Sequence, residues 1–64
     1  MGAEGIMFTA REEYTNGSVS ACVSFKSTEA TEAWATAELG KDPGAVVTAW
    51  KAFTAEVFCI YRAG

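Results

Sequence analysis

The residues of this chain that could do chemistry are two cysteines and several closely spaced carboxylates. Cys22 and Cys59 stand far apart in the sequence. They form no Cys-x-x-Cys pair and supply too few ligands for a metal site. We therefore expect two reduced thiols that pack as small hydrophobic residues. A disulfide would require that the strands carrying them are neighbours.

Other catalytic chemistry lacks its usual residues. The 64 residues include no histidine, which excludes Ser-His-Asp and Cys-His catalysis as well as histidine zinc sites. The glycine spacing matches neither a dinucleotide fingerprint nor a P-loop. Glu12 and Glu13 are adjacent on an expected strand and point to opposite faces. Glu29 and Glu32 share one face of an expected helix, where they suit the positive end of its dipole. We therefore expect no enzyme and no cofactor.

A hairpin is the clearest local prediction. Asn16-Gly17 is typical of a two-residue type I′ turn, because both central positions of that turn need positive φ. Apolar residues alternate on each side of it. A two-residue loop sets a register that pairs Phe8 with Phe25, Ala10 with Val23, Glu12 with Ala21 and Tyr14 with Val19 on an inner face. Glu12 is the exception on that apolar face, and we expect it to reach water near the turn.

A helix should follow the hairpin. Ser27 and Thr28 are good capping residues, and Glu29 suits the first turn. An apolar stripe with helical spacing comes next, anchored by Trp34. Leu39-Gly40 is expected to end the helix, since glycine is common just past the last turn.

The segment after this helix allows two interpretations. Asp42-Pro43 is typical of a second helix start, and the 3–4 spacing of Val46, Val47, Trp50 and Phe53 supports a helix. Residues 28–53 would then form one kinked helix or two. The alternative makes residues 45–50 a strand, because Val and Trp favour strands.

Residues 56–62 should form the last strand, which is apolar on both faces. Such a strand is usually covered on both sides or presents one face to a partner. We expect it to pair with the first strand. The predicted fold is α+β: a three-stranded antiparallel sheet with one or two helices packed on one face, in the order β-β-α-α-β. Residues 1–64 would form one domain.

Charge and composition limit the partners. The formal net charge of −3 argues against direct binding to nucleic acid or to an anionic membrane. The sequence has no signal-peptide pattern and no apolar run near the roughly 18 residues of a membrane span. We therefore expect a cytoplasmic protein, a monomer, whose partner is another protein.

The acidic residues suggest where that partner binds. Five of the eight fall between positions 12 and 38, so the hairpin tip and the first helix would carry a continuous acidic surface. A tyrosine at the tip would help to anchor a contact. The predicted partner-binding residues are Glu12, Glu13, Tyr14, Glu29, Glu32 and Glu38. Such a surface fits a basic, nucleic-acid-binding surface on another protein.

The chain resembles small phage-encoded anti-CRISPR proteins that act on type I CRISPR-Cas complexes. The likeness lies in its length, its acidic balance, the hairpin at Asn16-Gly17 and the segment Asp42-Pro43-Gly44-Ala45 before a closing strand. The resemblance implies an inhibitor in the host bacterial cytoplasm that binds a Cas subunit or complex and blocks target DNA, without catalysis or cofactor. The alternative function is a structural or regulatory module that dimerises through an edge strand.

Overall fold

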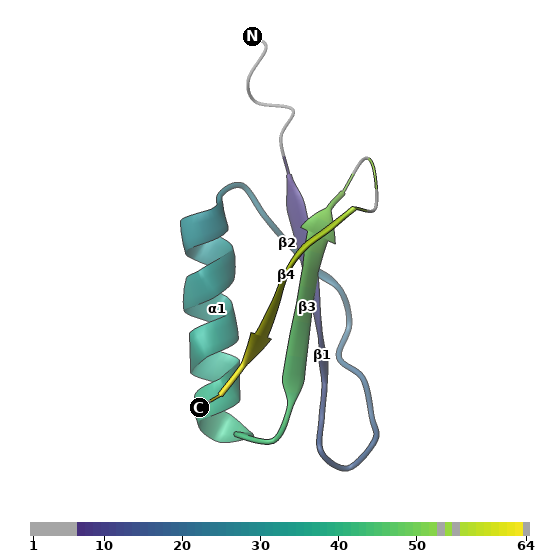
Figure 1. Cartoon of the computed structure of the whole chain (residues 1–64), viewed down its shortest axis with the longest axis vertical. Helices are drawn as coiled ribbons and strands as arrows, with labels where there is room; N and C mark the ends of the chain where they lie inside the picture. Colours follow the sequence, from purple (N-terminus) through teal and green to yellow (C-terminus); the bar gives the residue numbers. More distant parts are fainter. Residues whose placement is uncertain (1–6, 53, 55, 64) are drawn as a thin grey trace, which may run out of the picture.

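The structure, a computed structural model, describes residues 7–52, 54 and 56–63. Phe53, the Phe58 side chain and the first six residues lie outside this part. The described elements are β1 (Phe8–Glu13), β2 (Val23–Phe25), α1 (Thr28–Lys41), β3 (Val46–Lys51) and β4 (Val57–Arg62). The strands form one antiparallel sheet in the order β2-β1-β3-β4. The helix covers one face of this sheet (Figure 1).

The α+β class is therefore confirmed, and its details differ from the prediction. The described part contains four strands and one helix. The expected second helix is wrong: residues 46–51 form β3, as the strand alternative proposed. Asp42, Pro43 and Gly44 form a reverse turn, in which the Ala45 amide donates to the Asp42 carbonyl at 2.9 Å. Proline suits the second position of such a turn, so this segment reverses the chain and starts a strand.

The position of the last strand also differs from the prediction. β4 pairs with β3, and β3 pairs with β1. The expected contact between the last and first strands is therefore wrong. Because the chain enters the sheet again directly after α1, β3 occupies the place beside β1, and β4 becomes an edge strand.

The hairpin register is confirmed near its base and wrong at its tip. Phe8 faces Phe25 and Ala10 faces Val23, as predicted. Towards the tip Glu13, rather than Tyr14, faces Val19. The Gly17 amide donates to the Tyr14 carbonyl at 3.0 Å, and the Tyr14 amide donates to the Ser18 carbonyl at 2.8 Å. The loop therefore has three residues and ends at Gly17, whose φ is 92°, instead of being the two-residue turn.

The helix begins as predicted and ends slightly later. The Ser27 hydroxyl accepts from the Ala30 amide at 3.1 Å, which caps the first turn. The helix continues through Gly40 to Lys41, and the Asp42 amide donates to the Glu38 carbonyl at 3.1 Å. Among the described residues, α1 is the only helix, and it is too short and too polar to cross a bilayer.

The core lies between α1 and the sheet, and much of it is alanine. The buried hydrophobic residues are Phe8, Ala10, Ala35, Leu39, Ala45, Val47 and Ala49. Trp34, Phe25 and Tyr61 pack half-buried against them. The rings of Phe25 and Trp34 lie 5.6 Å apart at 47°, so Trp34 anchors the helix on β2. Alanines on both sides let α1 approach the sheet closely.

Candidate interaction surfaces

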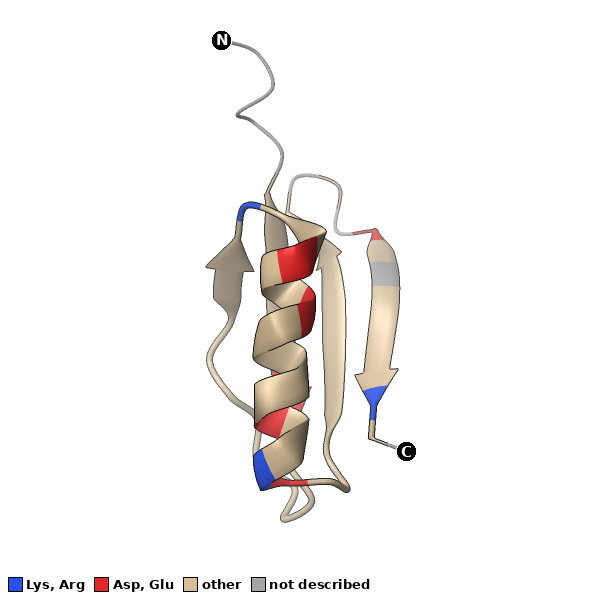
Figure 2. Ribbon diagram, turned by 90° about the vertical axis from the view of Figure 1, so that its left-hand side faces the viewer, with Lys and Arg blue, Asp and Glu red and all other residues tan. Residues whose placement is uncertain are grey.

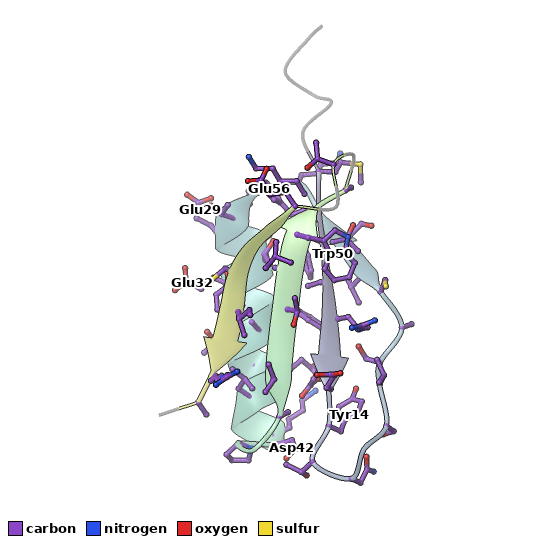
Figure 3. The ribbon with its side chains drawn as sticks, turned by 45° about the vertical axis from the view of Figure 1, so that its right-hand side comes forward. Tyr14, Glu29, Glu32, Asp42, Trp50 and Glu56 are labelled. Carbon is purple, nitrogen blue, oxygen red and sulfur yellow. The ribbon has the colours of Figure 1, made fainter. Side chains whose placement is uncertain are left out.

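The structure separates five of the six predicted contact residues into three groups, and the sixth, Glu38, is half-buried on α1. Glu29 and Glu32 are exposed on α1 and project from its side (Figure 3), and Glu32 is close enough to Tyr61 of β4 to raise the pKa of that tyrosine. Glu13 and Tyr14 lie at the hairpin tip. Glu12 is buried beneath the helix. The continuous acidic surface expected over the tip and the helix is thus divided among separate sites.

The expected exposure of Glu12 is wrong. Its side chain is 0% exposed, because β1 carries it inward beside Ala10 while the C-terminal half of α1 lies over it. Both carboxylate oxygens lack a hydrogen-bond partner among the described residues. Burial, reinforced by the nearby Glu38 and Asp42 carboxylates and opposed by Lys41, raises the pKa of Glu12 above its ordinary 4.5. A buried carboxyl of this kind cannot contact a partner protein.

The acidic residues of α1 differ in how accessible they are. Figure 2 shows acidic positions spaced along the helix and a basic residue in its last turn. That residue, Lys41, lies 3.4 Å from the half-buried Glu38 carboxylate. Glu29 and Glu32, one turn apart in the first half of the helix, are fully available at the surface. The acidic surface that a partner can reach on α1 therefore centres on these two residues.

The hairpin tip is held against the turn that follows α1. The Thr15 amide donates to Oδ2 of Asp42, and the Thr15 hydroxyl donates to Oδ1, each at 3.0 Å. Tyr14 is half-buried at the same end of the molecule (Figure 3). Glu13 is exposed and pairs with Val46, which places it on the sheet face opposite α1. Glu13 and the helix acids therefore lie on opposite sides of the molecule.

The sheet face opposite α1 is a surface that the acidic-patch prediction missed. Cross-strand partners share a face, and the pairing places Thr9, Trp50 and Val57 in one row across it. Val57 and Ile60 are 53% and 52% exposed. Trp50 is half-buried and points away from the helix (Figure 3). The apolar residues on both faces of the last strand were the sequence signal for this surface.

The described part of the chain was also searched for reactive thiols and for groups of metal ligands. Cys22 and Cys59 are free thiols, as predicted. Cys59 is half-buried, but the expected packing of Cys22 as a small hydrophobic residue is wrong, because Cys22 is exposed. Residues 7–52, 54 and 56–63 hold no group of three or more potential metal ligands. Comparison with protein-family models, curated proteins and solved structures gives no match. The candidate interaction sites are therefore the acidic residues on α1 and the open face of the sheet.

Proposed function

We propose that this chain is a small acidic inhibitor that binds a basic, nucleic-acid-binding surface on another protein. The observation that carries the proposal is the exposure of Glu29 and Glu32 one turn apart on α1. The resemblance to anti-CRISPR proteins supports a type I Cas complex as the partner. In this account the helix carboxylates occupy positions that the phosphates of target DNA otherwise take.

The surroundings of these two residues favour such a contact. The outward positions that follow them on α1 include Ala33, Thr36 and Ala37, all exposed. Small side chains let a partner approach the helix closely, and a capped helix holds the carboxylates in a fixed arrangement. Exposed charges of this kind mainly raise the association rate and fix the orientation of the complex.

Binding to a purified type I surveillance complex, measured at several salt concentrations, tests the proposal. The Glu29→Lys/Glu32→Lys variant should bind at least about tenfold more weakly and with less salt dependence. Glu56→Lys is the control for a charge reversal elsewhere on the surface, because Glu56 is also exposed and lies off the helix near Lys51. Equal loss in both variants would contradict a specific role for α1.

The second candidate function is a module that associates with itself through an edge strand. Its support is the position of β4 at the sheet edge together with the exposed Val57 and Ile60 on that strand. An edge strand presents unpaired backbone groups to another chain. Sedimentation of the purified chain at several concentrations tests this candidate, and a strict monomer would count against it.

A further inference from the structure

The uncovered face of the sheet carries three ordered rows of side chains. The pairing of β1, β3 and β4 gives the rows Thr9–Trp50–Val57, Arg11–Thr48–Ile60 and Glu13–Val46–Arg62, with a register shift of β4 between the first two rows. No described element lies over these rows, since α1 packs on the other face (Figure 2). The apolar side chains of these rows lie on β3 and β4. In the last row Glu13 on β1 and Arg62 on β4, which carry opposite charges, lie on either side of β3.

The core between α1 and the sheet is small, so burying the open face of the sheet would add to the stability of the fold. Four of the seven buried hydrophobic residues in the described part are alanines, which bury little apolar surface. Chains of this size commonly gain stability by oligomerisation. Two large aliphatic side chains and part of a tryptophan remain in water on a flat sheet face, and burying them would extend the core.

We propose that a second copy of this chain packs face to face on the open side of the sheet, about a two-fold axis that runs along β3. With this axis each row of one copy lies over the same row of the other copy. The strand order is reversed, so that β1 of one copy lies over β4 of the other. β3 then lies over β3 of the second copy, at the spacing of roughly 10 Å usual for stacked sheets. Helix α1 of each copy remains on the outside.

The charges on the face select this axis. In the row Glu13–Val46–Arg62, the reversal places Glu13 over Arg62 of the second copy, and the same pair forms again by symmetry. Arg11 comes to lie over Ile60 of the second copy, where its aliphatic stem can pack. An axis across the strands at the middle row would instead place Arg11 over Arg11 of the second copy, and like charges would repel. The face is therefore complementary to itself in one orientation.

This dimer is independent of the proposed inhibitor function. The acidic residues Glu29 and Glu32 stay exposed on the outer helices, so each copy keeps its acidic surface. A sheet face of three strands with six residues each has a footprint of roughly 14 by 20 Å. That is small for a protein interface, and we expect an equilibrium between monomer and dimer that depends on concentration.

Analytical ultracentrifugation of the full chain, from low to high micromolar concentration, tests the proposal. The wild-type chain should shift from monomer to dimer. Val57→Lys should raise the dissociation constant at least about tenfold. Thr36→Lys, which adds the same charge on the exposed side of α1, should leave it unchanged. Circular dichroism and melting curves check that each variant is folded, and Ile60→Lys serves if Val57→Lys does not fold.

A charge exchange tests the axis itself. Glu13→Arg should weaken the dimer roughly fivefold, because two Arg–Arg contacts replace two ion pairs. The double variant Glu13→Arg/Arg62→Glu should restore it. A wild-type chain that stays monomeric throughout would overturn the proposal. A dimer whose dissociation constant changes neither in Glu13→Arg nor in the double variant would also overturn it. That result is the one expected if two copies pair along the β4 edge.

Discussion

Thr15 in the hairpin loop is hydrogen-bonded to Asp42 in the turn that follows α1. Asp42 accepts hydrogen bonds from both the amide and the hydroxyl of Thr15, each at 3.0 Å. The two residues are 27 positions apart in sequence, and they connect the hairpin loop to the turn between α1 and β3. The contact thus fixes how the hairpin lies against the helix.

We predict that Asp42→Ala lowers the free energy of unfolding by about 1–2 kcal/mol, because it removes the acceptor of both bonds. Thr15→Val, which keeps the shape of the side chain, should cost less, and the double variant should show coupling between the two positions. Urea denaturation measures all three. Glu56→Ala, at an exposed acid 3.9 Å from Lys51, should change stability by less than about 0.5 kcal/mol.

Gly44 should not tolerate a side chain. A Cβ at this position would overlap the Thr15 methyl group, so Gly44→Ala should destabilise the fold by about 1–3 kcal/mol. Thr15→Ser removes that methyl group and keeps the hydroxyl, and it should recover much of the loss. Gly40→Ala is the control: no atom comes within 4 Å of its added Cβ, and alanine in a helix should stabilise by roughly 0.5–1 kcal/mol. Equal effects at the two glycines would contradict the overlap.

The buried Glu12 should make stability depend on pH. Its pKa in the folded state is raised above the ordinary 4.5 by burial and by Glu38. The folded state therefore binds the proton more tightly than the unfolded state. The resulting stability is fully present below about pH 4.5 and is lost as the pH rises through the folded pKa. Glu12→Gln, which has no carboxyl group to ionise, should raise the melting temperature at pH 7 and change it little at pH 4. A variant that is less stable at pH 7 would contradict this account.

Tyr61 should contribute a second pH dependence in the alkaline range. Burial, the neighbouring Cys59 and the Glu32 carboxylate raise the pKa of Tyr61 from 10.0 to about 12. Its contribution to stability should therefore be complete below pH 10 and should disappear as the pH rises through about 12. Comparing urea denaturation of wild type and Tyr61→Phe between pH 9 and 12 isolates it. The Phe variant should lose less stability over that interval.

The parts of the fold that depend on local pairing could be predicted from the sequence. The alternation around Asn16-Gly17 identified the partners Phe8–Phe25 and Ala10–Val23, because the hairpin base is set by the apolar face. The tip could not be predicted as securely. Asn-Gly suits both the two-residue turn and the three-residue loop, which ends at Gly17 with positive φ.

Tertiary context decided the rest. Val46, Val47 and Trp50 fit a helical spacing, yet Ala45, Val47 and Ala49 are the buried set, and alanine is too small to reveal that alternation in the sequence. The burial of Glu12 depends on where the end of α1 comes to lie. No local pattern predicts this. The helical pattern was therefore enough to predict that Glu29 and Glu32 are exposed, but not that Glu12 is buried and Glu38 half-buried.

Displacement of target DNA from a type I surveillance complex tests the inhibitor account most directly. In a competition assay with labelled DNA, the wild-type chain should release the DNA as its concentration rises, and Glu56→Lys should act like wild type. Glu29→Lys/Glu32→Lys should need at least about tenfold more protein for the same release. DNA that stays bound at saturating wild-type chain, or equal release by the double variant, would contradict the account.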